Sequence, residues 1–349
     1  MDIAKRFTAN PIVTPAMVPP SRDGLEVACV LNPGAFRFAG KTWLLLRVAE
    51  RQPQRAGHVG TVITDPAAPG GVRLVEFSTS DPRFGGGGPC SFSFDGAHYL
   101  TTLSHLRLAS SDDGVRFAVD PAPTLRGVGP QEAYGVEDCR VTEVEGSYVL
   151  TYTAVSISGY GVGAMRTSDW KTFERLGVIV PPDNKDCAVF PEKIGGEYWC
   201  LHRPESGYTG PAIWIARSGD LKGWYGHAFL AGSRPGTWDA KRLGAGAAPI
   251  RTDEGWLEIY HGVSEQKGYC LGGLLLDLED PTRIIARSDE PFMEPTEEYE
   301  KKGFVNSVVF TNGHVVDGDT VTIYYGASDS FVCGARVSIR EVLASLKRL

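Results

Sequence analysis

One repeated unit dominates this 349-residue sequence. In each copy, a turn that contains glycine precedes a short apolar segment rich in aromatic residues. The five copies lie at 40–47, 146–152, 196–202, 255–261 and 318–325. Companion segments run from an apolar stretch through a turn with serine and aspartate to an aromatic residue, at 106–117, 163–173 and 213–224. Short strands separated by regularly spaced turns predict an all-β protein.

The spacing of the copies favours a five-bladed β-propeller that forms one domain over 1–349. The last four copies start at residues 146, 196, 255 and 318, so they are 50, 59 and 63 residues apart. Four-stranded propeller blades repeat every ~40–50 residues. A β-sandwich is the alternative, but it has no reason to repeat this unit five times. The predicted blades lie at about 34–117, 135–175, 186–230, 244–288 and 305–340.

Two segments depart from this repeat. The stretch 52–100 interrupts the period and contains four consecutive glycines at 85–88, so we expect a loop insertion over one face. The stretch 337–349 predicts a short C-terminal helix, because its apolar residues recur at helical spacing, at Ile339, Val342, Leu343 and Leu346.

Composition narrows the class of protein. A net charge of −7 argues against a nucleic-acid partner, and no apolar run approaches the ~20 residues of a membrane helix. The start of the chain has no apolar signal-peptide core. The seven cysteines lack CxxC spacing, and the seven histidines form no HxxxH pair. We therefore expect a soluble, cytoplasmic protein without a metal or cofactor, and the sequence leaves its oligomeric state open.

Candidate site residues lie where small-residue turns lead into short strands. In a propeller such strand ends converge on the axis, and five segments fit: 31–36, 134–140, 184–193, 243–249 and 303–310. Strand alternation at 136–140 would place Glu137 and Cys139 on one face, and Asp138 and Arg140 on the other. The pKa of an inward Asp138 would stay low beside cations and rise beside carboxylates. The alternative is a structural Asp–Arg ion pair between blades.

These segments, in this order, resemble glycoside hydrolase family 130. That family comprises inverting β-mannoside phosphorylases and β-1,2-mannosidases on a five-bladed propeller. The resemblance covers nearly the whole chain, and its usual Glu-Asp-Pro-Arg motif reads Glu-Asp-Cys-Arg here. The matching positions are Asn32–Gly34, Arg47, Gly135–Arg140, Asn184–Asp186, Phe190–Lys193, His202–Pro204, Gly244–Gly246, Tyr260–Gly262 and Tyr325–Asp329.

The resemblance implies a role for several residues. Asp138 is similar to the family's general acid, which protonates the glycosidic oxygen through a sugar hydroxyl. Asn32, Arg47, His202 and Asp329 resemble residues that hold the sugar, since buried hydroxyls need hydrogen-bond partners. Further candidates for binding an oligosaccharide or mannoside substrate are Arg107, Glu137, Arg140, Lys185, Asp186, Arg203, Lys241, Tyr260 and His261.

The sequence favours hydrolysis over phosphorolysis. An inverting hydrolase needs a second carboxylate ~6.5–9.5 Å from the acid, whereas a phosphorylase needs cations that bind phosphate. Glu205, directly after His202–Pro204, is the first candidate for the base, and Asp239 is the second. The insertion also resembles the mannosidase branch. We thus expect a glycosidase that cleaves β-mannosides, in particular β-1,2-linked manno-oligosaccharides.

Two alternatives remain. Lys185, Lys241 and Arg242 could bind inorganic phosphate as a co-substrate, which would make the protein a β-mannoside phosphorylase that releases mannose 1-phosphate. A propeller with an axial pocket could also be a non-catalytic sugar-binding module, which would need no acid at Asp138.

Overall fold

The computed structural model describes residues 2–349, and they form a protein built almost wholly of β-strands. Within this range the α-helices are α1 (Glu298–Lys301) and α2 (Ile339–Ser345), accompanied by three single turns of 3₁₀-helix. The all-β prediction is confirmed. The prediction for 337–349 is right only in part, because Leu346–Arg348 leave the helix and form strand β28.

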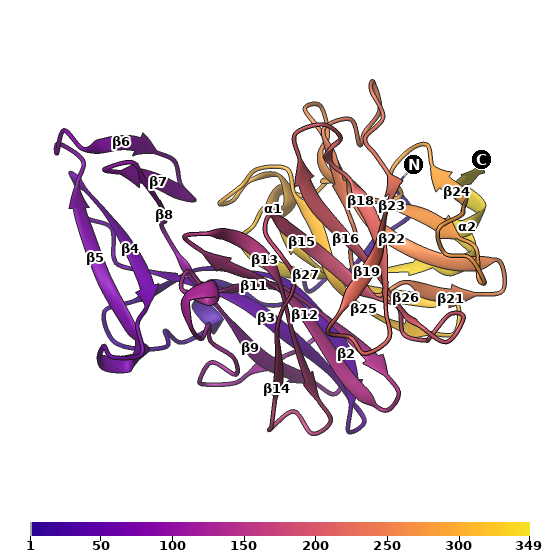
Figure 1. Ribbon diagram of the computed structural model, residues 1–349, viewed down its shortest axis with the longest axis horizontal. Helices are drawn as coiled ribbons and strands as arrows, with labels where there is room; N and C mark the ends of the chain where they lie inside the picture. The colour runs from indigo at the N-terminus through magenta and orange to yellow at the C-terminus, as the bar shows by residue number, and fades with distance from the viewer. Residues whose placement is uncertain (1) are drawn as a thin grey trace.

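Five antiparallel sheets follow one another along the chain (Figure 1). The first contains β2 (Glu26–Phe38), β3 (Lys41–Arg51), β9 (Leu103–Ser111) and β10 (Ala118–Val119). The second contains β11 (Val136–Val144), β12 (Ser147–Ser156), β13 (Gly159–Thr167) and β14 (Glu174–Val180). The third contains β15 (Asn184–Val189), β16 (Tyr198–Ser206), β18 (Ile213–Ser218) and β19 (Trp224–Ala231), with β17 (Gly210–Pro211) beside β16.

The last two sheets include the ends of the chain. The fourth contains β20 (Arg242–Gly244), β22 (Gly255–Ser264), β23 (Gly268–Leu276), β24 (Ile284–Ser288) and β28 (Leu346–Arg348), with β21 (Ile250–Thr252) beside β22. The fifth contains β25 (Val309–Asp317), β26 (Thr320–Ala327), β27 (Phe331–Ser338) and, at its edge, β1 (Lys5–Arg6). The five sheets lie close to the five spans that the repeat predicts.

Each sheet shares an apolar core with its neighbours. One core joins the first and second sheets through residues such as Leu45 and Leu150, and further cores join the second to the third, the third to the fourth and the fourth to the fifth. A fifth core joins the first sheet to the fifth, where Leu44 packs with Tyr324 and Val332. The five sheets are therefore linked in a cycle by buried apolar surface, which is the main favourable term in folding.

The first strands of the sheets lie against one another and carry a shared irregularity. Strand β2 lies against β25 and β11, and β11 lies against β15. In each of these four strands the pairing register shifts, and the shifts enclose Asn32, Asp138, Asp186 and Asn312. Asn32, Asp138 and Asp186 have φ of 45°, 51° and 54°, a left-handed conformation that Asn and Asp tolerate better than most residues. Such bulges re-aim side chains.

The bulge in β11 overturns the predicted alternation at 136–140. Glu137 and Asp138 point to the same side, since both contact the guanidinium of Arg47. Cys139 turns into the core between the first and second sheets. The extra residue in the bulged strand breaks the period of two on which the prediction relied.

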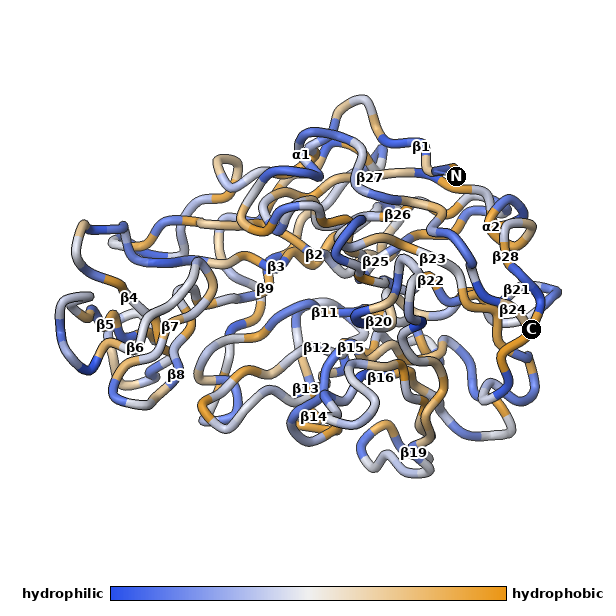
Figure 2. Tube along the Cα trace, turned by 90° about the horizontal axis from the view of Figure 1, so that it is seen from above, coloured by the Kyte–Doolittle hydropathy of each residue, from blue (hydrophilic) through white to orange (hydrophobic). Residues whose placement is uncertain are grey.

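The insertion forms a structured arm, which we define as residues 52–102. It consists of a two-stranded sheet of β4 (His58–Thr64) and β5 (Val72–Ser78) and a three-stranded sheet of β6 (Phe84–Gly87), β7 (Ser91–Phe94) and β8 (Ala97–Leu100). Figures 1 and 2 show it projecting from one side of the five sheets. Aromatic rings hold the two small sheets together, with Phe77 and Phe94 centroids 4.4 Å apart. The expected loop is thus a small folded unit.

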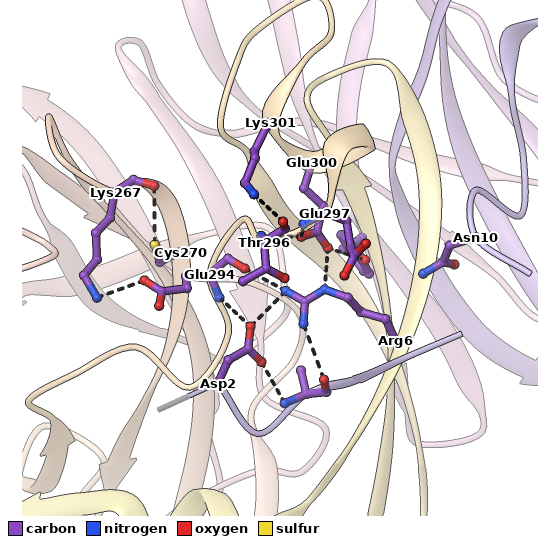
Figure 3. Close-up of polar contacts among 12 residues, drawn as sticks. Asp2, Arg6, Asn10, Lys267, Cys270, Glu294, Thr296, Glu297, Glu300 and Lys301 are labelled. Atoms are coloured by element: carbon purple, nitrogen blue, oxygen red, sulfur yellow. Dashed lines mark hydrogen bonds and ion pairs between the residues drawn. The ribbon is translucent and has the colours of Figure 1, made fainter. Parts of the chain in front are cut away.

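A buried ion pair fixes the N-terminal segment to the segment around α1 (Figure 3). Glu300 is fully buried and accepts hydrogen bonds from Arg6 Nε and Tyr325 Oη, both at 2.7 Å. Arg6 also donates to the carbonyl oxygen of Glu294 at 2.6 Å. Because β1 is short, this side-chain network supplies much of its attachment.

Replacing Arg6 with methionine is expected to lower the free energy of unfolding by about 3 kcal/mol or more, because it leaves the Glu300 carboxylate buried without its cation. Denaturant titration measures this loss. Lys5→Met, at the exposed neighbouring position, serves as the control and should change little. The double variant with Glu300→Gln should regain part of the loss; if it does not, the buried charge is not the cause.

Candidate active site

A pocket of about 160 Å³ lies where the bulged first strands meet. Ten of the predicted site residues line it: Asn32, Arg47, Glu137, Asp138, Lys185, Asp186, Arg203, His261, Asp329 and, from the phosphate-binding alternative, Arg242. They come from all five sheets or the turns beside them, so the fold gathers residues that are almost 300 positions apart in the sequence. Tyr269, Val308 and Phe310 complete the lining.

Asp138 lies at the centre of one hydrogen-bonded group. Its Oδ1 accepts from Asn32 Nδ2 at 2.9 Å and from Arg47 Nη1 at 3.0 Å. Arg47 also pairs with Glu137 at 2.7 Å, so one guanidinium holds two adjacent carboxylates. Arg140 Nη1 donates a hydrogen bond to the backbone oxygen of Asp138 at 2.9 Å. The Asp138 side chain is thereby fixed in one orientation.

The carboxyl groups of Asp138, Glu137 and Asp329 have pKa values that are shifted in different ways. Burial works to raise the pKa of Asp138, but Arg47, Arg140 and Asn32 hold it below its usual value. Burial raises the pKa of Glu137, opposed by Arg47 and assisted by Asp138. Burial also raises the pKa of Asp329 to about 6, and the negative charges of Asp138 and Glu137 add to this effect. Carboxyl groups set apart in this way are typical of acid–base sites.

The raised pKa of Asp329 predicts a stability effect. Its pKa is about 6 in the folded protein against an ordinary 3.8, so ionisation opposes folding. The penalty is small near pH 4 and complete above about pH 7. Asp329→Asn should therefore raise the free energy of unfolding of the ligand-free protein at pH 8 by up to about 3 kcal/mol. This gain should shrink towards zero near pH 4.

Thermal unfolding at several pH values between 4 and 8 checks this expectation. Asp112→Asn is the matched control, since the Asp112 side chain is 83% exposed. A gain for Asp329→Asn that is equal at all pH values would contradict the assignment of the effect to ionisation.

A second charged group surrounds Asp186. This carboxylate pairs with Arg203 Nε at 2.5 Å and Arg140 Nη2 at 2.9 Å, and together they hold its pKa far below the usual value despite its burial. His261 Nε2 lies 3.5 Å from it, but burial lowers the pKa of His261 to about 3, so the imidazole is neutral. A Cβ at Gly244 would lie 2.4 Å from Asp186 Oδ2, which explains the glycine there. Ion pairs therefore link neighbouring sheets at both carboxylates: Arg47–Asp138 joins the first sheet to the second, and Arg140–Asp186 joins the second to the third.

Two cations of the pocket have no carboxylate partner. Within residues 2–349, neither Lys185 nor Arg242 forms an ion pair, although both line the pocket. Lys185 Nζ lies 4.8 Å from the centre of the Tyr160 ring, and burial together with Arg203 lowers the pKa of its ammonium. A partly buried ammonium without an anion favours binding of an anionic ligand.

Both candidates for a water-activating base lie outside the lining of the pocket. Glu205 is only partly exposed and pairs with Arg203 at 2.6 Å. Asp239 is fully buried and accepts hydrogen bonds from Arg287, Arg234 and the Tyr260 hydroxyl. Neither carboxylate therefore lines the pocket, and each pairs with arginine instead. The order of residues in the sequence does not reveal these partners, which come together only in the folded chain.

Other predicted binding residues also lie away from the pocket. Lys241 pairs with Glu265 at the surface, and Tyr260 belongs to the Asp239 network. Arg107 is buried and donates to the backbone oxygen of Pro19. His202 is buried against Asn184 and His227, and burial lowers its pKa to about 3. Arg140 is buried and does not line the pocket, but it contacts two residues that do, Asp138 and Asp186.

Sequence reasoning missed the aromatic side of the pocket. Tyr269 and Phe310 line it, and the Phe310 ring lies 4.4 Å from the His261 ring. Phe310 ends 303–310, one of the five segments predicted to contribute to the site. The sequence alone, however, does not distinguish these pocket aromatic residues from the aromatic residues of the core.

A small polar pocket with carboxylates, cations, an amide and aromatic rings is suited to a hydroxyl-rich ligand such as a sugar. Residues 93–348 match the model of glycoside hydrolase family 130, described as beta-1,4-mannooligosaccharide phosphorylase. The chain belongs to this family, and it is an enzyme of carbohydrate metabolism by that membership.

Individual proteins similar to this chain are phosphorylases that act on mannosides. A beta-1,2-mannobiose phosphorylase of Listeria innocua is 39% identical over 347 residues, 98% of both chains. A 1,2-beta-oligomannan phosphorylase of Thermoanaerobacter sp. is 39% identical over 70% of this chain and 82% of its own. The solved structure of the Listeria innocua enzyme in complex with beta-1,2-mannobiose superposes with a TM-score of 0.93 at 38% identity, covering 98% of each chain.

Within residues 2–349, the structure contains no helix with the length and apolar character needed to cross a bilayer.

Proposed function

We propose that this protein is an inverting β-mannoside phosphorylase that acts on β-1,2-mannobiose or short β-1,2-linked oligomannosides. The observation that carries the proposal is the pair of unpartnered cations, Lys185 and Arg242, in the pocket that contains Asp138. The relatives named above are phosphorylases, which favours this alternative over the hydrolase expected from the sequence. The positions of Glu205 and Asp239 also argue against hydrolysis, because neither is free to activate water.

We infer a five-bladed propeller of a single domain for the whole chain. The cyclic sequence of shared cores, with the fifth sheet packed against the first, supports this arrangement. In it, the five sheets are blades and the catalytic pocket lies at one end of the axis.

The proposed reaction divides between the two ends of the pocket. Phosphate, bound by Lys185 and Arg242 with Arg203 beside them, attacks the anomeric carbon as the glycosidic C–O bond breaks. Asp138 supplies the proton that the leaving oxygen needs, relayed through a sugar hydroxyl as the family resemblance implies. The products are α-mannose 1-phosphate and the shortened sugar. Arg47, Arg140 and Asn32 hold the pKa of Asp138 below its usual value, and the negative charge of bound phosphate would raise this pKa and favour the protonated form.

The test is to incubate the purified protein with β-1,2-mannobiose, with and without inorganic phosphate, and to identify the products. We expect mannose 1-phosphate and mannose with phosphate, and no cleavage without it. Mannose alone, formed equally without phosphate, would establish hydrolysis. Binding without cleavage under either condition would indicate the non-catalytic module. Running β-1,4-mannobiose in parallel tests the linkage.

A further inference from the structure

A second cavity of about 230 Å³, here called the outer lobe, adjoins the catalytic pocket. The two share four lining residues: Arg47, Glu137, Lys185 and Asp329. A substrate whose anomeric carbon lies near Asp138 and Lys185 can thus extend from one cavity into the other. Together the two cavities reach the size of a typical small-molecule site, ~300–1,000 Å³.

The arm builds part of this lobe. Cys90, Leu100 and Thr102 of the arm line it, together with residues of the first and second sheets such as Ala49 and Val155. Phe304, from the segment after α1, adds an aromatic ring. The arm therefore contributes to the cavity next to the proposed acid, although the catalytic pocket contains no arm residue.

The two cavities differ in chemical character. In the catalytic pocket most lining residues are charged or carry amide, imidazole or phenol groups. Apart from the four shared residues, the outer lobe offers only the hydroxyls of Thr102, Thr153 and Tyr160 and the thiols of two cysteines, and the rest of its lining is hydrocarbon. The catalytic pocket therefore offers many hydrogen-bonding groups to a sugar ring, and the outer lobe adds few of its own.

We propose that the outer lobe binds the leaving group mainly by apolar contact, so that an aryl or alkyl alcohol can replace the leaving sugar. This inference rests on the proposed phosphorylase function. A site that hydrogen-bonds a substrate rejects analogues lacking the group by ~10⁴–10⁵-fold, whereas an apolar pocket discriminates only ~10–200-fold. The enzyme is accordingly strict for the mannosyl group in the catalytic pocket and permissive for the group in the outer lobe.

Benzyl β-mannoside is the probe, and methyl β-mannoside is its matched control. In both reactions phosphate attacks the anomeric carbon, and the alcohol leaves with the proton from Asp138. The two differ by an aromatic ring that would enter the outer lobe. We expect kcat/KM for the benzyl compound to exceed that for the methyl compound about tenfold or more, since burial of such a ring is worth this ratio. Equal values would overturn the proposal.

A matched pair of variants places the effect in the arm. Leu100→Asn keeps the side-chain size and removes apolar surface from the lobe, so it should lower kcat/KM for benzyl β-mannoside about five- to tenfold more than kcat/KM for the methyl compound. Leu74→Asn makes the same change in the arm at a side chain that is 37% exposed and outside the lobe, and it should alter neither value. Parallel losses on both compounds in Leu100→Asn would contradict the assignment.

Labelling of Cys90 tests the lobe without turnover. Cys90 is the exposed member of the seven free cysteines, so N-ethylmaleimide should modify it first, and Cys90→Ser should remove this labelling. Benzyl β-mannoside should slow the labelling, and methyl β-mannoside should not. If the protein cleaves no mannoside, the proposed function fails and this experiment alone decides what the lobe binds. If mannobiose is cleaved but the benzyl compound gives no protection, the lobe proposal fails and the function stands.

Discussion

Asp138→Asn is expected to lower turnover of β-1,2-mannobiose by about 10²–10⁴-fold, the range for loss of a general acid. The amide cannot supply the proton for the leaving oxygen. The variant should keep its fold, because asparagine tolerates the left-handed φ of 51° at this position, and its side-chain oxygen can still accept from Asn32 and Arg47.

Steady-state rates with phosphate in excess measure this effect, and thermal unfolding shows whether the fold is intact. Asp112→Asn, at an exposed site, should have wild-type activity. Leaving groups of low pKa need less help from an acid, so an activated aryl β-mannoside should lose less than mannobiose. A folded Asp138→Asn protein with near-normal turnover of mannobiose would refute the role of Asp138.

Lys185→Met is expected to raise KM for phosphate about 10- to 100-fold, because charge-assisted hydrogen bonds contribute ~1.5–3 kcal/mol. Arg242→Gln should act in the same direction, and the double variant should show the larger loss. Stability should not fall in Lys185→Met. Among the residues that the structure describes, its ammonium has no carboxylate partner, and burial lowers its pKa, so replacement removes an unfavourable charge.

Initial rates over a range of phosphate concentrations give these values. Lys241→Met is the control, because Lys241 neighbours Arg242 in the sequence but pairs with Glu265 outside the pocket. An unchanged KM for phosphate in the Lys185 and Arg242 variants, together with intact turnover, would place the phosphate elsewhere.

Much of the architecture could be predicted from local patterns. Glycine turns, alternating apolar strands and their fivefold recurrence depend on neighbours in the sequence, and the five sheets lie close to the predicted spans. The pocket segments around Asn32, Asp138 and Asp186 were recognisable for the same reason. Small and polar residues interrupt apolar strands there, and the structure places a register shift at each of them.

The choice between the two reactions depends on contacts that no local pattern contains. The sequence predicts Glu205 and Asp239 as bases, and in the folded chain Glu205 pairs with Arg203 while Asp239 pairs with Arg234 and Arg287. The β11 bulge likewise reversed the direction predicted for one of two adjacent carboxylates.

The sequence by itself determined the β-strand content, the repeat and the identity of the acidic and basic residues near the pocket, because these follow from periodicity and residue type. Only the tertiary structure decided which of those charges are paired, which face the pocket, and that the arm supplies one wall of the outer lobe. Charge pairing depends on distances of a few ångströms between residues far apart in the chain, and packing of the whole molecule sets those distances.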